Sequence, residues 1–136
     1  MKTVIFACVH NAGRSQIAAA YFNRLADPAR ARALSAGTRP LGQIHPEVVK
    51  VMQEEGIDLA AVRPQKLTAE LAADAELLIT MGCGDECPYV PGVRRADWPL
   101  EDPKGQPIER VRVIRDVIRA QVRALVLDEG VALPTG

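Results

Sequence analysis

Short apolar runs of strand type alternate along this chain with segments whose apolar residues recur at helical spacing. The strand candidates lie at 2–7, 33–36, 77–81 and 93–98. The helix candidates lie at 15–25, 45–55, 68–73 and 108–125. Strands that alternate with helices form parallel βαβ units, in which helices cover the sheet. We therefore predict an α/β fold with one parallel sheet and helices on both of its faces.

The size and charge of the chain limit what it does. Its 136 residues are 48% hydrophobic, which suits one domain covering 1–136. Lys plus Arg number 17 and Asp plus Glu number 17, whereas nucleic-acid binders show a basic excess. No apolar run approaches the roughly 20 residues that cross a bilayer, and the first residues lack a secretory signal. We expect a cytoplasmic monomer that binds neither nucleic acid nor membrane.

The three cysteines are distributed unevenly along the chain. Cys8 follows the first predicted strand, whereas Cys83 and Cys87 lie together after the third. An odd number of cysteines argues against a purely structural disulfide framework. Ligands of parallel sheets bind beyond the carboxyl ends of the strands, and Cys8, Cys83 and Asp102 all follow such ends. We therefore expect the functional site at this edge of the sheet.

The segment from Cys8 to Ser15 has the form Cys-x5-Arg-Ser and lies between a predicted strand and a predicted helix. Such a turn directs successive backbone N–H groups inward, and the helix N-terminus adds positive potential. The planar fork of Arg14 suits an oxyanion, and the positive field favours the reactive thiolate of Cys8. The expected oxyanion-binding residues are Val9, His10, Asn11, Ala12, Gly13, Arg14 and Ser15.

Each of these residues also has a simpler interpretation. A lone buried cysteine after a strand is usually a small apolar residue, and Cys-x5-Arg also occurs by chance. The strand before the loop, the helix after it and the glycine within it favour a nucleophilic Cys8. Ser15 is able to donate a hydrogen bond to that thiolate, and Asn11 to brace the loop. We give His10 no catalytic role, because its backbone amide alone explains its place.

Four segments resemble arsenate reductases built on the low molecular weight tyrosine phosphatase fold. They are Cys8-Val9-His10-Asn11-Ala12-Gly13-Arg14-Ser15-Gln16, Ser35-Ala36-Gly37, Met81-Gly82-Cys83-Gly84-Asp85-Glu86-Cys87-Pro88 and Asp97-Trp98-Pro99-Leu100-Glu101-Asp102-Pro103. The resemblance covers nearly the whole chain and implies a four-stranded parallel sheet flanked by helices. It also implies that Cys8 attacks arsenate, that Arg14 binds it and that Asp102 is the general acid. The nearby Asp97 is then a structural residue at a strand end.

Two features favour a reductase over a phosphatase of the same fold. Phosphatases of this fold usually have proline after the Arg-Ser pair, where this chain has Gln16. Their acid loop carries aromatic residues after Asp-Pro, whereas here Lys104 and Gly105 follow. The chain has only one Trp, two Tyr and two Phe, so a small inorganic substrate is expected. A phosphatase remains the enzymatic alternative, and the reductase itself is expected to retain weak phosphatase activity.

The resemblance gives Cys83 and Cys87 a role in a thiol relay. Cys83 is expected to attack the Cys8–arsenic adduct and Cys87 to attack Cys83, leaving a Cys83–Cys87 disulfide. Helical residues four apart have Cβ atoms about 5–6 Å from each other, whereas a disulfide needs about 3.8 Å. We expect this segment to unwind on oxidation, because Gly84 and Pro88 weaken a helix there. A structural zinc site is disfavoured, since it usually needs four closely spaced ligands.

The relay requires an external thiol reductant and no bound cofactor or metal. Thioredoxin is slightly favoured, whereas the spacing of the cysteine pair also resembles members that use mycothiol; bacillithiol and glutaredoxin stay open. Some relatives bind potassium beside the anion loop, but Ala19 stands where their glutamate lies, so no potassium requirement is expected. A non-enzymatic alternative is a thiol trap for trivalent arsenic or a metal, because arsenite prefers sulfur ligands.

One helix carries a conspicuous basic stripe. The arginines of the predicted C-terminal helix are Arg112, Arg115, Arg119 and Arg123. Charged stripes on amphipathic helices usually face water. We expect these side chains to form a solvated face.

Overall fold

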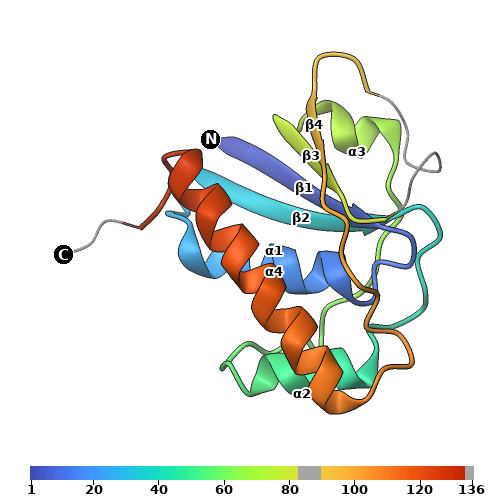
Figure 1. The fold of residues 1–136 in the computed structure, drawn as a ribbon. Coiled ribbons are helices and arrows are strands. Elements are labelled where there is room, and N and C mark those ends of the chain that lie inside the picture. The colour runs from blue at the N-terminus through green and yellow to red at the C-terminus, as the bar shows by residue number, and fades with distance from the viewer. Residues whose placement is uncertain (83–89, 134–136) are drawn as a thin grey trace.

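A four-stranded parallel sheet forms the centre of the computed structural model, which describes residues 1–82 and 90–133 (Figure 1). The strands are β1 (Lys2–Cys8), β2 (Ala31–Gly37), β3 (Leu77–Thr80) and β4 (Arg94–Asp97). Their order in the sheet is β2-β1-β3-β4, and all three pairs are parallel. This confirms the predicted α/β class and the four-stranded sheet. The second strand is longer than predicted because β2 pairs with β1 over its whole length, from Lys2↔Ala31 to Cys8↔Gly37.

Within residues 1–82 and 90–133, four helices connect or follow these strands. They are α1 (Arg14–Leu25), α2 (Pro46–Gln53), α3 (Ala69–Ala73) and α4 (Ile108–Asp128). The predicted helix at 45–55 ends earlier because the chain turns at Gly56, whose φ is +75°. In the part of the chain covering 1–82 and 90–133, no helix combines the length and apolarity that a membrane span requires.

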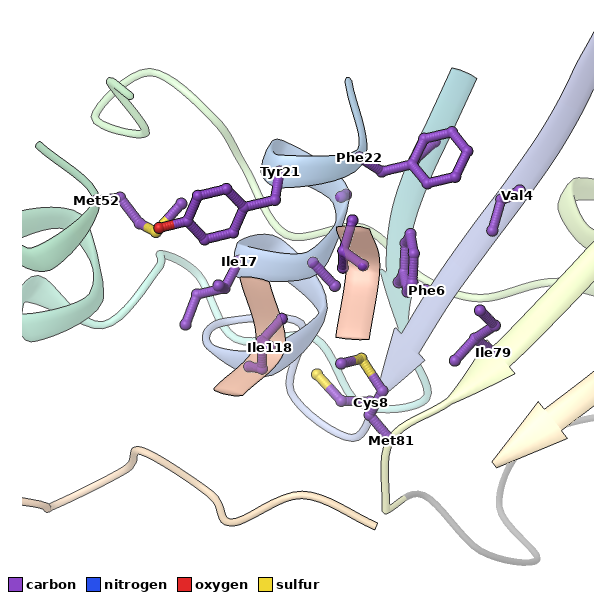
Figure 2. Close-up of a cluster of buried hydrophobic side chains, with 14 of the residues drawn as sticks. Val4, Phe6, Cys8, Ile17, Tyr21, Phe22, Met52, Ile79, Met81 and Ile118 are labelled. Carbon is purple, nitrogen blue, oxygen red and sulfur yellow. The ribbon is translucent and has the colours of Figure 1, made fainter. Parts of the chain in front are cut away.

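The two faces of β1 are buried in different apolar clusters. Val4, Phe6 and Cys8 belong to the larger cluster, which includes side chains of α1, α2 and α4 (Figure 2). Ile5 and Ala7 point the other way, into a smaller cluster that contains one residue of α3. A parallel strand covered on both faces is apolar throughout, which explains the unbroken run in the sequence. Helices therefore lie on both faces of the sheet, as predicted, although unequally.

The predicted solvated face of α4 is confirmed for Arg119 and Arg123, which are exposed, but not for Arg115, which is buried. Arg112 and Arg115 both bind the carboxylate of Glu54, at 2.7 and 2.9 Å, and Arg119 binds Glu55 at 2.9 Å. The two hydrogen-bonded guanidinium groups, first that of Arg112, lower the pKa of Glu54 to about 2. The expectation was wrong for Arg115 because the acidic end of α2 lies against α4, a contact that the periodicity of one helix does not reveal.

Candidate active site

Cys8 is the last residue of β1, and its sulfur lies at the base of the loop that follows. The residue is only 3% exposed, and its Sγ lies 2.9 Å from Oγ of Ser15 in the first turn of α1. Nδ2 of Asn11 donates to the same Oγ at 2.7 Å. Because Ser15 accepts from Asn11, its own hydroxyl proton is available to Cys8. This arrangement suits a thiolate at Cys8, which needs a donor.

Asn11 braces the loop from within the protein. The residue is fully buried and is the one described non-glycine residue with positive φ, at 51°. Its Oδ1 accepts from the backbone N–H of Gln65 at 2.8 Å and from Nε2 of Gln16 at 3.2 Å. Asparagine tolerates this left-handed conformation better than most residues. Bracing by Asn11 was predicted, but its backbone conformation and its contacts to Gln16 and Gln65 were not.

The carbonyl groups of the loop are hydrogen-bonded from outside by the segment that follows β2. Each bond runs from a backbone N–H to a backbone carbonyl oxygen: Thr38 to Cys8 (3.3 Å), Arg39 to Val9 (2.8 Å), Leu41 to His10 (3.0 Å) and His45 to Ala12 (3.0 Å). In a trans peptide the N–H points away from the preceding C=O. The outward carbonyl groups therefore turn the following N–H groups to the other side, as an anion-binding nest requires. Nothing in the sequence identified 38–45 as the support of this loop.

Arg14 connects the loop to the segment that carries Asp102. Its side chain is 11% exposed; Nη1 donates to the carbonyl oxygen of Leu100 at 3.2 Å, and Nη2 lies 3.6 Å from Oδ2 of Asp102. The segment just after β3 approaches the same guanidinium, because a Cβ on Gly82 would lie 2.6 Å from Nη1. The structure thus brings Arg14 and Asp102 together, although they are far apart in the sequence.

Asp102 is exposed, with 46% of its side chain accessible. Its Oδ1 accepts the backbone N–H of Lys104 at 3.0 Å, which fixes the turn that follows. The neighbouring Pro103 is buried, and its ring lies 2.8 Å from the position of a Cβ on Gly13. Asp102 therefore lies on a loop that packs directly against the anion loop.

Three further residues that the sequence analysis singled out are Asp97, Cys83 and Cys87. Asp97 ends β4, where it accepts a hydrogen bond from the hydroxyl of Thr80 at 2.7 Å. Cys83 and Cys87 lie outside the described residues. Among residues 1–82 and 90–133, no group of three or more His, Cys, Asp or Glu side chains is arranged to hold a metal ion.

His45 lies beside the loop, and no role was predicted for its side chain. It is the N-cap of α2, it is half-buried, and its Cδ2 lies 3.6 Å from the position of a Cβ on Gly13. Burial lowers the pKa of the imidazole, and the negative charges of Asp102 and Glu47 partly oppose this. The only signal in the sequence was its place before Pro46, which marks the start of a helix and says nothing of the loop.

Aromatic side chains do not surround the described part of the site. Phe6, Tyr21 and Phe22 are buried in the core, and the ring of Trp98 packs on Phe6 with centroids 5.7 Å apart. The loop after Asp102 continues with proline, lysine and glycine. The aromatic side chains of the described residues therefore belong to the core or pack against it.

Known proteins resemble this chain over most of its length. A “Putative arsenate reductase” of Halobacterium salinarum is 40% identical over 123 residues, which cover 86% of this chain and 85% of that protein. A “Glutaredoxin arsenate reductase” of Synechocystis is 32% identical over 129 residues, covering 93% and 97%.

The solved structure of a thioredoxin-dependent arsenate reductase of Corynebacterium glutamicum is also similar. Its TM-score is 0.81 at 38% identity, and the likeness covers 94% of this chain. This chain spans only 61% of the length of that protein. The model of the low molecular weight phosphotyrosine protein phosphatase family matches residues 3–132, nearly the whole chain. With its anion loop after β1 and its parallel sheet, this chain belongs to the low molecular weight phosphotyrosine protein phosphatase family.

Proposed function

We propose that this chain reduces arsenate to arsenite, with Cys8 as the nucleophile. The observation that carries the proposal is the buried sulfur of Cys8, hydrogen-bonded to Ser15 at the base of a loop whose carbonyl groups point outward. Such a loop suits a tetrahedral oxyanion. Arsenate is favoured over a phosphate ester because similar proteins are named arsenate reductases, and because no aromatic residue follows Asp102.

The first step is an attack of the Cys8 thiolate on arsenic. A sulfur–arsenic bond forms, one arsenic–oxygen bond breaks, and the leaving oxygen takes a proton from Asp102 and departs as water. Arg14 and the N–H groups of residues 9–15 hold the remaining oxygens, and the arsenic stays pentavalent. Protonation of the leaving group by a placed acid is worth about 10²–10⁴-fold in rate.

The second and third steps transfer two electrons through Cys83 and Cys87. The Cys83 thiolate attacks the sulfur of Cys8, the sulfur–arsenic bond breaks, and its electron pair reduces arsenic to the trivalent state of arsenite. The Cys87 thiolate then attacks the sulfur of Cys83, which releases the Cys8 thiolate and leaves a Cys83–Cys87 disulfide. Both cysteines come from the sequence, and this relay is the part of the proposal that rests on the family resemblance.

An external dithiol or small thiol closes the cycle by reducing the Cys83–Cys87 disulfide. One similar protein is named thioredoxin-dependent and another is named for glutaredoxin, so both donors are candidates. Thiols stay reduced in the cytoplasm, where we place the reaction. The cycle needs no bound cofactor and no metal, and a monomer suffices for it.

Arsenate turnover with thioredoxin, glutaredoxin and small-thiol systems in parallel tests the proposal. We expect turnover with at least one donor and none in Cys8→Ser with any of them. Cys87→Ser tests the relay separately, because full turnover of this variant with a small thiol would show that the third cysteine is dispensable. Failure of the wild type with every donor would refute arsenate reduction.

Phosphate ester hydrolysis is the second candidate, and membership of the phosphatase family favours it. Both reactions share the attack of Cys8 on a tetrahedral oxyanion. Brisk hydrolysis of an aryl phosphate without arsenate turnover would identify a phosphatase. Arsenite binding that survives in Cys8→Ser, without either activity in the wild type, would instead identify a thiol trap.

A further inference from the structure

The carbonyl groups of residues 8–12 in the anion loop are all hydrogen-bonded, but one of them has a different kind of donor. Four accept from backbone N–H groups in 38–45, namely those of Cys8, Val9, His10 and Ala12. The carbonyl oxygen of Asn11 accepts from a side chain, Nε2 of Gln16, at 3.0 Å. Gln16 thus completes from α1 the support that 38–45 gives to the rest of the loop.

The backbone conformation of Asn11 explains this exception. Its φ of 51° is left-handed, and no other described non-glycine residue has a positive φ. A left-handed residue turns its carbonyl group relative to those of its neighbours. The carbonyl of Asn11 consequently lies against the first turn of α1, where Gln16 is buried. The hydrogen bond from Gln16 therefore holds Asn11 in a backbone conformation that non-glycine residues rarely adopt.

The same nitrogen also fixes the side chain of Asn11. Nε2 of Gln16 lies 3.2 Å from Oδ1 of Asn11, and the backbone N–H of Gln65 donates to that oxygen at 2.8 Å. Two donors at one end of the amide identify that end as the oxygen, since the amide nitrogen only donates. Nδ2 of Asn11 then faces Ser15, to whose Oγ it donates at 2.7 Å.

This chain of hydrogen bonds ends at the sulfur of Cys8. Oγ of Ser15 lies 2.9 Å from Sγ of Cys8, and because it accepts from Asn11, its own proton is available to the sulfur. Gln16, Asn11, Ser15 and Cys8 are each 3% exposed or less, so bulk water does not replace a donor that is removed. The direction of the Ser15 proton therefore depends on the orientation of the Asn11 amide.

We propose that Gln16 is a positioning residue, which locks the backbone and the amide of Asn11 so that Ser15 donates its proton to the thiolate of Cys8. The proposal rests on the proposed role of Cys8 as the nucleophile. Without the Gln16 amide, Oδ1 of Asn11 keeps the donor from Gln65, while its carbonyl oxygen loses the bond to α1. The loosened Asn11 no longer holds Ser15 in the donating orientation, and less thiolate forms at a given pH.

The rate at which iodoacetamide alkylates Cys8, followed against pH, tests the proposal without any turnover, because the thiolate is the form that reacts. The tryptic peptide of residues 3–14 contains Cys8 and neither of the other cysteines, so mass spectrometry measures this residue alone. In Gln16→Met, which keeps a similar size but has no N–H, we expect the alkylation profile to move to higher pH. On its rising limb the rate should fall roughly two- to tenfold, the effect of one net hydrogen bond. At a pH where the thiol is fully ionised in both proteins, the rates should be equal.

Gln65→Met is the matched control. Gln65 contacts the same oxygen of Asn11, but through its backbone N–H, which the substitution retains. Its side chain is exposed and donates to the carbonyl oxygen of Ser35 at 2.9 Å. Gln16 and Gln65 also line the same surface hollow beside α1, so the control removes an amide from the same surroundings. We expect the wild-type alkylation profile in Gln65→Met.

Three results would overturn the proposal. The first is a wild-type alkylation profile in Gln16→Met, and the second is an equal displacement of the profile in both variants. The third is faster alkylation of Gln16→Met at every pH, which would show an opened loop instead of a reoriented donor.

An NMR titration of the wild type decides the matter where Gln16→Met does not fold. Groups in a hydrogen-bonded chain polarise one another. The side-chain amide resonances of Gln16 are therefore expected to move as Cys8 ionises, whereas those of Gln65 stay, and in Cys8→Ser the movement should vanish. Amide resonances of Gln16 that do not respond to the ionisation of Cys8 would refute the proposal.

Arsenate turnover gives a separate readout. Because kcat/KM reports the ionisation of groups in the free enzyme, its acid limb should move to higher pH in Gln16→Met by the same interval as the alkylation profile. If the alkylation and NMR effects are found but the wild type reduces no arsenate, the proposed function fails and the role of Gln16 stands.

Discussion

Gly82 is the position where one methyl group is expected to weaken oxyanion binding most directly. It is the last described residue before Cys83, and its φ of +90° lies in the region that favours glycine. A Cβ there would lie 2.6 Å from Nη1 of Arg14, well inside contact distance. The contacted atom is the end of a flexible side chain, so in Gly82→Ala we expect the guanidinium of Arg14 to move away from Leu100.

The substitution has two costs of different kinds. Placing alanine at a positive φ costs about 1–2 kcal/mol of folding stability, whatever its neighbours are. Displacement of Arg14 weakens hydrogen bonds from a charged donor, each worth about 1.5–3 kcal/mol. Since about 1.4 kcal/mol equals a tenfold change in an equilibrium constant, KM for arsenate is expected to rise about ten- to a hundredfold.

Gly92 provides a matched control for the backbone cost. Its φ is +83°, and a Cβ there meets no atom within 4 Å. Gly92→Ala and Gly82→Ala should therefore lose similar stability, measured by urea unfolding, while only Gly82→Ala raises KM in steady-state arsenate reduction. A wild-type KM in Gly82→Ala, or an equal rise in both variants, would refute the inferred contact between Gly82 and Arg14.

Three further predictions concern stability. Arg115→Met loses hydrogen bonds to Glu54 and to a buried backbone carbonyl, so urea unfolding should show a loss of roughly 1–3 kcal/mol, whereas Arg123→Met, at an exposed position, should lose little. Burial, and then the hydrogen bond to Glu55, raises the pKa of Tyr21 to about 12. The neutral hydroxyl therefore contributes fully to folding stability below about pH 10, and this contribution is lost as the pH rises through 12. Tyr21→Phe should lack this alkaline loss of stability in unfolding experiments. Oδ1 of Asn11 already accepts two N–H hydrogen bonds, so we expect it to bind no potassium ion beside the anion loop. Tm should therefore be equal in potassium chloride and in sodium chloride at the same ionic strength, and a large difference would contradict this.

The fold was predictable because local patterns determine it. The unbroken apolar run of β1 follows from burial on both faces, and the spacing of apolar residues in α4 follows from one buried stripe. Both patterns are visible within a single segment of the sequence. The ends of α2 and β2 were less predictable, since strand pairing and a turn at Gly56 decide them. The ion pairs of α4 were missed because they depend on which helix lies opposite.

The residues alone predicted the site where it is continuous in sequence, and the family resemblance added Asp102, which the structure places beside Arg14. Cys8, Arg14 and Ser15 come from one loop, whose spacing encodes its geometry. Residues 38–45 support that loop through backbone hydrogen bonds, which almost any residue type is able to form. The side chains of this segment therefore did not indicate its role. His45 was missed for a related reason, because its contact with Gly13 depends on how α2 approaches the loop.

The first chemical step does not distinguish a reductase from a phosphatase; the group that next reaches the Cys8 adduct does. Water completes a phosphatase cycle, whereas a second thiol completes a reductase cycle. Gly82, the residue before Cys83, lies against the guanidinium that we propose holds the oxyanion. The chain therefore leaves β3 beside the anion loop, and the absence of a side chain at Gly82 lets it approach that closely. The proposed relay needs Cys83 to reach the Cys8 adduct, and Gly82 lets the chain that leads to Cys83 pass beside Arg14.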